Sequence, residues 1–310
     1  MSHITLHCTE CGAVRDADMS ALHCEECNSP LEVAYVDPVA STSSPQPPRW
    51  AGAPVPLPLH DPDAVVSLGE GNTPCVEMAD LGKLLGLRRL YGKLEFLSPT
   101  GSFKDRGTAV MMSVAREQGV TEIVEDSSGN AGASVAAYAA KVGIKSHVFA
   151  PASAPAAKVG QIRVYGACTR SIEGAREAAT AAAVDFHVER GLVYASHNLS
   201  PYFIEGTKTF AYEVAAQTQG DLPEHIVVPV GNGSLFIGAW KGFSELKDAG
   251  RIARIPRLHC IQASAFMPIV AAYQGIEWTA QPGAKTVAGG ISAADPPRCT
   301  PDAPDHIKGM

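Results

Sequence analysis

Between about residue 65 and residue 263 the chain alternates short apolar runs with longer helix-forming stretches, and this alternation most constrains the fold. At this spacing, strand–helix–strand units form parallel sheets with right-handed crossovers and helices on both faces. The predicted strands are 121–126, 145–150, 168–172, 191–196, 225–230 and 257–263, and the predicted helices are 130–142, 156–165, 174–186, 204–217 and 234–246. The sequence therefore predicts an α/β fold.

Length and charge exclude several classes of protein. The 310 residues suffice for roughly two domains, and a hydrophobic content of 45% is that of a globular chain. The net charge of −7 offers no broad basic field for nucleic acid or an anionic membrane. No apolar run approaches the roughly 20 residues of a membrane helix, and residues 1–10 do not resemble a signal peptide. We therefore expect a cytoplasmic protein.

Two Cys-x-x-Cys pairs stand close together near the N-terminus. Cys8 and Cys11 are followed, after a twelve-residue spacer, by Cys24 and Cys27. This spacing is typical of a tetrahedral zinc site with four thiolate ligands; incidental thiols and a redox role are the alternatives. Among the Lys, Arg, Asp and Glu residues of segment 1–31, all are acidic except Arg15, which argues against phosphate contacts. The sequence therefore predicts a structural zinc ion.

The composition divides the chain into four segments. Residues 1–36 form the zinc-ribbon-like segment, and residues 37–63 are rich in Pro and form a linker or extended arm. Residues 64–295 hold the strand–helix alternation, and residues 296–310 read as an irregular tail.

Lys104 lies in the stretch SPTGSFKDRG, residues 98–107. It follows an aromatic residue at the start of an apolar helix-forming stretch, a setting that can remove water from the ammonium group and lower the pKa of the lysine. A lysine that can lose its proton can form a Schiff base with an aldehyde cofactor. A solvated surface lysine is the alternative.

Two further loops each follow a predicted strand and open a helix, which is where parallel sheets bind ligands. The loop SSGNAG, residues 127–132, offers hydroxyl, amide and backbone N–H groups to a carboxylate or a phenolate oxygen. The loop VGNGS, residues 230–234, allows backbone N–H groups to approach a small monophosphate. An ordinary helix cap and a packing turn are the alternatives. With Lys104, the loops supply the parts that hold pyridoxal phosphate.

Several stretches, in one order, resemble the threonine synthase family of the tryptophan-synthase-β-like, fold type II, pyridoxal-phosphate enzymes. They are SPTGSFKDRG (98–107), SSGNAGASVAAYAAKVGI (127–144), VVPVGNGS (227–234), GEGNTP (69–74) and QIRVYGA (161–167). The similarity runs from about 65 to 292, and some family members also carry a zinc-ribbon-like N-terminal segment. The resemblance implies two doubly wound parallel-sheet subdomains and a homodimer, with residues 64–295 as the pyridoxal-phosphate-binding catalytic domain.

The resemblance also implies a role for each matching residue. Lys104 is the catalytic residue, which forms the internal aldimine and then acts as general base. Asn130 bonds the cofactor 3′-oxygen, and the substrate carboxylate binds Ser127 and Ser128. The cofactor phosphate is bound by Gly231, Asn232, Gly233 and Ser234.

The implied reaction is that of a carbon–oxygen lyase acting on phosphates in amino-acid biosynthesis. O-phosphohomoserine loses its phosphate by elimination, and water adds to give threonine. Relatives deaminate threonine or serine, or replace a β-substituent, and these activities are the alternatives.

Two departures from the family pattern bear on the substrate. Phe203 stands where many threonine synthases carry an arginine, and Lys208 is the remaining cation nearby. After residue 295 the chain does not follow the family, so we expect a truncated C-terminal part and assign no residue to the pyridine nitrogen. A truncated, non-catalytic protein of the same fold is therefore a further alternative. His197 is expected to be structural rather than part of the site.

Overall fold

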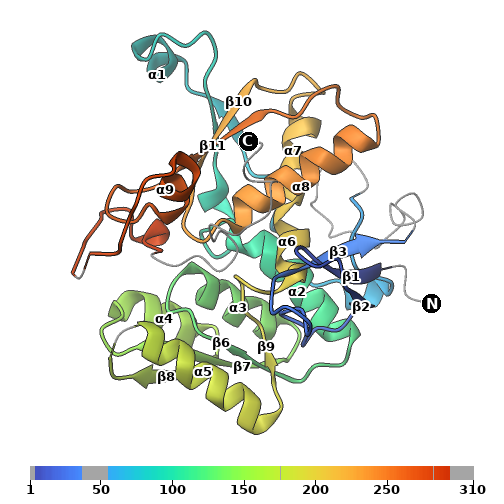
Figure 1. Cartoon of the computed structure of the whole chain (residues 1–310), viewed down its shortest axis with the longest axis vertical. Coiled ribbons are helices and arrows are strands. Elements are labelled where there is room, and N and C mark those ends of the chain that lie inside the picture. Colours follow the sequence, from blue (N-terminus) through green and yellow to red (C-terminus); the bar gives the residue numbers. More distant parts are fainter. Residues whose placement is uncertain (1–3, 37–54, 175, 282, 294–310) are drawn as a thin grey trace.

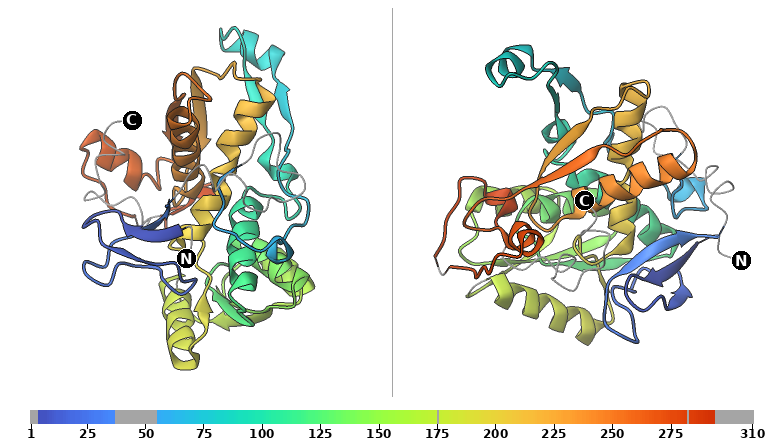
Figure 2. Two further views of the ribbon diagram at one scale, coloured as in Figure 1. Left: turned by 90° about the vertical axis from the view of Figure 1, so that its right-hand side faces the viewer. Right: turned by 45° about the horizontal axis from the view of Figure 1, so that its top comes forward.

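The computed structural model describes residues 4–36, 55–174, 176–281 and 283–293 (Figure 1). Its N-terminal part is a three-stranded antiparallel sheet of β1 (Ile4–Cys8), β2 (Val14–Asp16) and β3 (Leu31–Tyr35). The strand order is β2-β1-β3. Figure 2 shows this sheet, in dark blue, at one side of the molecule. Apolar residues on alternate positions of β1 and β3 point into the core, as the two-residue period of a strand requires.

A four-stranded parallel sheet forms the lower part of Figure 1. Its strands are β6 (Glu122–Glu125), β7 (Lys145–Pro151), β8 (Cys168–Ile172) and β9 (Val193–Tyr194), in the order β8-β7-β6-β9. Side chains of α3 (Asn130–Lys141) and α4 (Ala156–Val164) pack against one face, and those of α5 (Arg176–Arg190) against the other. Helices on both faces of a parallel sheet confirm the predicted α/β fold class.

The second parallel sheet is smaller. Within the described residues it contains β10 (His225–Pro229) and β11 (Arg257–Ile261). The helices α6 (Pro201–Thr207), α7 (Thr209–Gln217), α8 (Ser234–Asp248) and α9 (Pro268–Gln274) follow or flank these strands, and α2 (Lys104–Glu117) lies between the two parts (Figure 1).

Three predicted elements differ most from the structure. The single helix expected at 204–217 is two helices, α6 and α7, which meet at Lys208. The hydroxyls of Thr207 and Thr209 donate to backbone carbonyls at the junction, and such bonds compete with the helical ladder. The strand expected at 191–196 has only two residues, because β9 pairs only with β6 and only at two positions. The helix expected at 174–186 begins at Arg176 and continues to Arg190.

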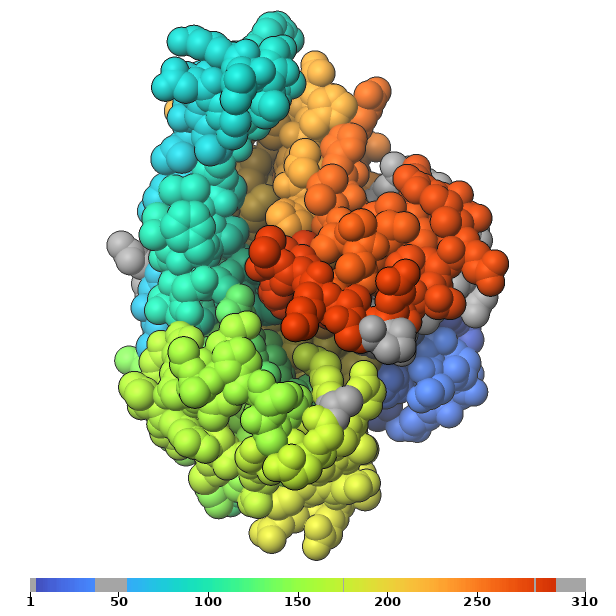
Figure 3. Space-filling view, turned by 90° about the vertical axis from the view of Figure 1, so that its left-hand side faces the viewer, coloured from blue at the N-terminus to red at the C-terminus, as the bar shows by residue number. Residues whose placement is uncertain are grey.

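Residues 55–97 contain elements that the sequence analysis did not assign. These are β4 (Cys75–Glu77), α1 (Ala79–Leu84) and β5 (Tyr91–Lys93), with short 3-10 turns at Pro62–Ala64 and Glu95–Leu97. A further 3-10 turn lies at Gly289–Ile291, near the end of the described chain. The segment that contains α1 projects from the top of the molecule, in cyan in Figure 3. Val55, Leu57 and Leu59 are buried in the main core, so the end of the Pro-rich stretch packs on the protein.

Helix α6 packs tightly between α2 and α8. A Cβ atom on Gly206 would lie 2.0 Å from the carbonyl oxygen of Arg106 in α2, and one on Gly238 of α8 would lie 2.2 Å from Thr207 Oγ1. Only glycine permits these approaches. The two crossings fix the first residues of α2 and α8, Lys104 and Ser234, relative to each other.

Part of the sequence analysis concerns residues outside the described ones. Most of the predicted linker (37–54) and the tail (296–310) belong to that part, so the four segment boundaries stay predictions. In the described part of the chain, no helix is long and apolar enough to cross a membrane.

Candidate active site and metal centre

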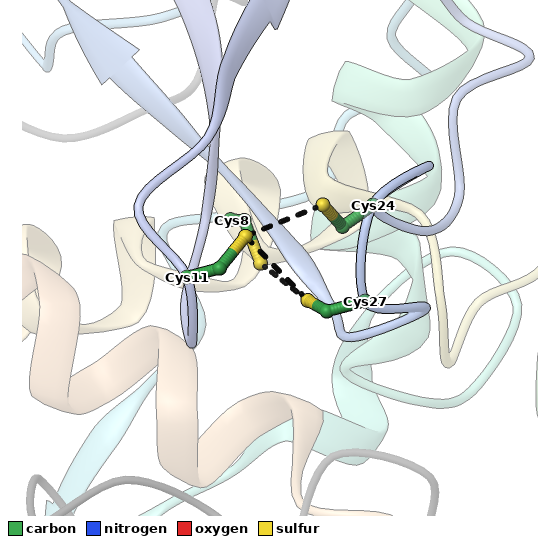
Figure 4. A group of neighbouring side chains, drawn as sticks. All are labelled: Cys8, Cys11, Cys24 and Cys27. Atoms are coloured by element: carbon green, nitrogen blue, oxygen red, sulfur yellow. Dashed lines mark hydrogen bonds between the residues drawn. The ribbon is translucent and has the colours of Figure 1, made fainter.

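The four N-terminal cysteines converge on one point (Figure 4). The Sγ atoms of Cys8 and Cys27 are 3.4 Å apart, and Cys11 Sγ lies 3.6 Å from both Cys24 Sγ and Cys27 Sγ. Four thiolates around zinc at about 2.3 Å would be separated by about 3.8 Å, close to these distances. All four thiols are free of disulfide bonds. The donor set therefore fits a structural zinc ion.

Lys104 begins α2, and its amine lies half-buried among aromatic rings. Lys104 Nζ donates a hydrogen bond to Ser234 Oγ at 3.3 Å. The same nitrogen lies 4.7 Å from the ring centroid of Phe103 and 5.4 Å from that of Phe203. Burial lowers the pKa of Lys104 to about 8, against the raising effect of the Glu125 carboxylate. At pH 7 about a tenth of the amine is therefore unprotonated, far more than for a lysine at the usual value of 10.5.

The loop that opens α8 has the geometry of an anion cradle. Gly233 adopts a left-handed conformation with φ of 89° and caps the helix, and no side chain accepts from the first turn. A Cβ atom on Gly231 would lie 3.2 Å from Ile291 Cα. Asn232 Nδ2 donates to Asn198 Oδ1 at 2.9 Å, and Ser234 is buried. The backbone N–H groups and the helix dipole fit a phosphate.

The loop that opens α3 is held by its own short contacts. Ser127 is buried, and its Oγ accepts from the backbone N–H of Gly129 at 3.2 Å. A Cβ atom on Gly132 would lie 1.8 Å from the Ser127 carbonyl oxygen, so this position requires glycine. Ser128 is half-buried, and Asn130 is exposed as the first residue of α3. No side chain caps this helix, and its N–H groups can receive a carboxylate.

One buried carboxylate joins the first two loops. Asp105 of α2 accepts hydrogen bonds from the backbone N–H and the hydroxyl of Thr100, and from Ser134 Oγ of α3 at 2.7 Å. The Lys104–Ser234 bond joins the first loop to the third. The structure thus brings together the helix starts that carry the predicted site residues, while the role of each residue stays a prediction.

The sequence analysis missed a second group of charged side chains at this site. Glu125 is the last residue of β6, and Asp126 is the first residue of the loop that follows. Together with His197 they form a group in which one carboxylate or ring-nitrogen atom of each residue lies within 4.8 Å of the others. Arg176 Nη2 lies 3.8 Å from Asp126 Oδ2. The available signal was the pair of acidic residues directly before Ser127 at the end of a predicted strand.

The two residues singled out as departures occupy buried positions. Phe203 packs beside Lys104, so an aromatic ring stands where the family pattern has a guanidinium. Lys208 is fully buried and forms ion pairs with Glu205 and, at 2.8 Å, with Glu245. The Lys208 ammonium is therefore neutralised by two ion pairs, and Lys208 does not replace the missing cation.

The sequence is similar to a family of known enzymes and to individual proteins in it. Residues 66–309 match the family described as "Pyridoxal-phosphate dependent enzyme". The threonine synthase of Methanocaldococcus jannaschii is 36% identical over 275 residues, which cover 86% of this chain and 67% of that protein. The threonine synthase of Methanosarcina acetivorans is 34% identical over 304 residues, which cover 95% and 74%.

The fold also matches solved structures. Maize serine racemase superimposes with a TM-score of 0.62 at 26% identity, over 71% of this chain. This chain spans 65% of the racemase chain, so the alignment leaves about a third of that protein unmatched.

Proposed function

The chain belongs to the pyridoxal-phosphate dependent enzymes, and on this premise we propose that it is a threonine-synthase-like lyase that carries its cofactor on Lys104. The observation that carries the proposal is the position of Lys104 Nζ. This amine is half-buried, has a pKa lowered to about 8, and lies 3.3 Å from Ser234 at the start of α8. An amine with a lowered pKa next to an anion cradle is the arrangement that covalent attachment of a phosphorylated aldehyde requires.

Lys104 and the residues around it would each bind a different part of the cofactor. Lys104 provides the point of attachment, and the loop 231–234 provides N–H groups for the phosphate. Asn130, at the start of α3, provides an amide for the ring oxygen. Pyridoxal phosphate supplies an aldehyde for attachment and a ring that withdraws electrons from the substrate Cα.

The chain's own groups then bind the substrate and move its proton. Ser127, Ser128 and the free N–H groups of α3 receive the α-carboxylate, which places Cα near Lys104. Once released from the cofactor, the Lys104 amine takes the Cα proton as a general base, and its lowered pKa suits this step near neutral pH.

We propose O-phosphohomoserine and water as substrates, with threonine and phosphate as products. The similarity to two proteins named threonine synthase, over 86% and 95% of this chain, supports this choice. The reaction is an elimination of phosphate followed by addition of water, and Lys104 is the group placed to carry protons in both.

A second candidate is a threonine or serine dehydratase, or an enzyme that replaces a β-substituent. Two observations favour it: Phe203 presents a ring beside Lys104 where a guanidinium could hold a phosphate, and the charge of Lys208 is consumed by Glu205 and Glu245. A site without that cation accepts a neutral side chain more readily than a dianion.

Two measurements on the purified protein test these proposals. Bound cofactor on Lys104 gives a visible absorbance band, which Lys104→Ala removes. Release of phosphate from O-phosphohomoserine then supports the synthase, whereas release of 2-oxobutyrate from threonine supports the dehydratase. A protein with the band that releases neither product and exchanges no β-substituent is the non-catalytic alternative, and a protein without the band contradicts the cofactor assignment.

We also propose that the four-cysteine cluster holds structural zinc. A three-stranded sheet this small has a limited core of its own, so the ion should contribute strongly to its folding. Cys24→Ser should lower both the zinc content and the melting temperature, whereas Cys168→Ser, at an exposed position outside the cluster, should change neither. Equal zinc content in both variants would contradict the site. The homodimer stays a prediction, which sedimentation analysis tests.

A further inference from the structure

Glu125 is the last residue of β6, and Asp126 directly follows the strand. Ile123 belongs to the main core cluster that includes α2, whereas Val124 packs with Ala183 of α5. Since side chains alternate along a strand, Glu125 shares the face of Ile123 and points toward α2. Asp126 points toward α5, where Thr180 Oγ1 donates to it at 2.6 Å.

The Glu125 cluster, defined as Glu125, Asp126 and His197, is buried and incompletely bonded. Glu125 is 0% exposed, and the other two are each 4% exposed. Glu125 Oε1 lies 2.8 Å from His197 Nδ1. Glu125 Oε2 and Asp126 Oδ1 have no hydrogen-bond partner among the described residues. A buried carboxylate oxygen without a partner is unfavourable, so it indicates a donor that reaches it in another state of the site.

On the side of the sheet that faces α2, Lys104 is the hydrogen-bond donor that we consider for Glu125 Oε2. The His197 ring packs edge-on against Phe203, with centroids 6.2 Å apart, and Lys104 Nζ lies 5.4 Å from the centroid of the same Phe203 ring. The charge of Glu125 acts on Lys104 directly and raises the pKa of its amine. Glu125, His197, Phe203 and Lys104 therefore form one continuous group at the candidate active site.

We propose that Glu125, oriented by His197, is the positioning residue that receives the Lys104 ammonium through its free oxygen Oε2. The inference rests on the proposed function, in which Lys104 leaves the cofactor and takes the Cα proton. As the Cα–H bond breaks and the Nζ–H bond forms, the amine becomes an ammonium. The buried Glu125 carboxylate balances this charge.

The other charges around Glu125 support an amine partner over a metal ion. The groups that act on it are Asp126 at the end of the same strand, Arg176 of α5, Lys104 of α2 and His197 after β9. Burial and the neighbouring Asp126 raise the pKa of Glu125, while burial and the Lys104 charge lower the pKa of His197. Two cationic side chains already face the cluster, and they would repel a divalent cation.

The pH dependence of cofactor attachment tests the role of Glu125. Zinc-loaded, full-length protein freed of cofactor is mixed with pyridoxal phosphate across a pH series, reduced with borohydride, and the modified Lys104 peptide is quantified by mass spectrometry. Attachment requires the unprotonated amine. The carboxylate raises the pKa of Lys104, so Glu125→Gln should move the midpoint of attachment to lower pH by about one unit.

Two further variants provide the controls. Glu125→Asp keeps the charge on a shorter side chain, so its midpoint should lie between those of the Gln variant and the wild type. If the Gln variant does not fold, the midpoint of Glu125→Asp is compared with that of the wild type instead. Glu70→Gln removes another fully buried carboxylate with a free oxygen, and it should leave the midpoint unchanged because Glu70 bonds Tyr138 instead.

Three results would overturn the inference. An unchanged midpoint in Glu125→Gln would mean that Glu125 stays protonated, with no charge to offer. A divalent ion bound by the wild type beyond its zinc, and lost in Glu125→Gln, would assign the cluster to a metal. Absence of attachment in the wild type would overturn the proposed function together with this inference, whereas attachment with an unmoved midpoint overturns the inference alone.

Discussion

Two buried charge clusters contrast in how completely their atoms are bonded. In the Arg106 cluster (Arg106, Lys93, Glu95 and Glu213), the guanidinium donates to Glu95 at 2.7 and 2.8 Å and to Glu213 at 2.9 and 3.0 Å, and Lys93 pairs with Glu213. In the Glu125 cluster, two carboxylate oxygens have no partner among the described residues.

The comparison separates a structural cluster from a functional one. A buried charge network whose members satisfy each other holds elements together and has no capacity left for a ligand. A buried cluster with free acceptors is unfavourable unless another group completes it, which is typical of sites that change state. Removing the cation that faces each cluster should therefore have opposite consequences for stability and function.

The largest effect on function is expected for Lys104→Met. The variant loses the amine that we propose binds the cofactor and moves the proton, so activity should fall at least about 1,000-fold. The free energy of unfolding in urea should change little, because Met fills the space between Phe103 and Phe203 and removes an ammonium group that burial already disfavours. A variant that loses stability as well as activity would show that this cluster is also structural.

The largest effect on stability is expected for Arg106→Met. Glu95 and Glu213 would keep buried charges with fewer partners, and the free energy of unfolding should fall by about 3–5 kcal/mol in urea denaturation. Arg89→Met is the control, because the Arg89–Asp221 pair lies on the surface and its loss should scarcely matter. Equal stabilities for the two variants would contradict the structural role.

The Arg106 cluster should also govern acid stability. Its cations and hydrogen bonds outweigh burial and lower the pKa of Glu213 to about 2. The stabilisation is therefore complete above the unfolded-state pKa near 4.5 and is lost as pH falls from there toward 2. We expect melting temperatures to decrease across this range in the wild type and to decrease less in Glu213→Gln. Parallel curves for the two proteins would exclude Glu213 as the source.

The smallest effect is expected for Glu125→Gln on stability. Burial raises the pKa of Glu125, so its charged form is disfavoured in the fold, and folding loses stability above the unfolded-state pKa. The Gln variant should be as stable as the wild type at pH 7, or slightly more stable, in urea denaturation. A clear loss would place Glu125 with the structural glutamates such as Glu213.

Local pattern predicted most of the fold in the catalytic part. The predicted strand 168–172 matches β8, and the predicted helices at 130 and 234 begin at the first residues of α3 and α8. These elements follow from periodicity and from glycine or polar residues at their starts, which are local signals. The junction at Lys208 depends partly on other helices, because Thr207 also donates to the Ser234 carbonyl of α8 and Lys208 pairs with Glu245 of the same helix, and no local pattern shows these contacts.

Some residues of the candidate site were predictable from local sequence patterns, and others were not. The loops with Lys104, Ser127 and Gly231 were visible because turn residues and polar groups follow predicted strands or open helices. Glu125 and His197 were present in the sequence as well, but 72 positions separate them and no local pattern pairs them. His197 was expected to be structural, and its contact with Glu125 gives it a place in the proposed site.

The sequence by itself determined the strand–helix order, the two cysteine pairs and the lysine at a helix start, since each depends on spacing along the chain. Only the tertiary structure decided which charges are satisfied. It buried Lys208 between two glutamates, put Phe203 beside Lys104, and left Glu125 with a free oxygen on the same face of the sheet. The reason is physical: desolvation and pairing depend on distances in space, which side chains from different elements set together.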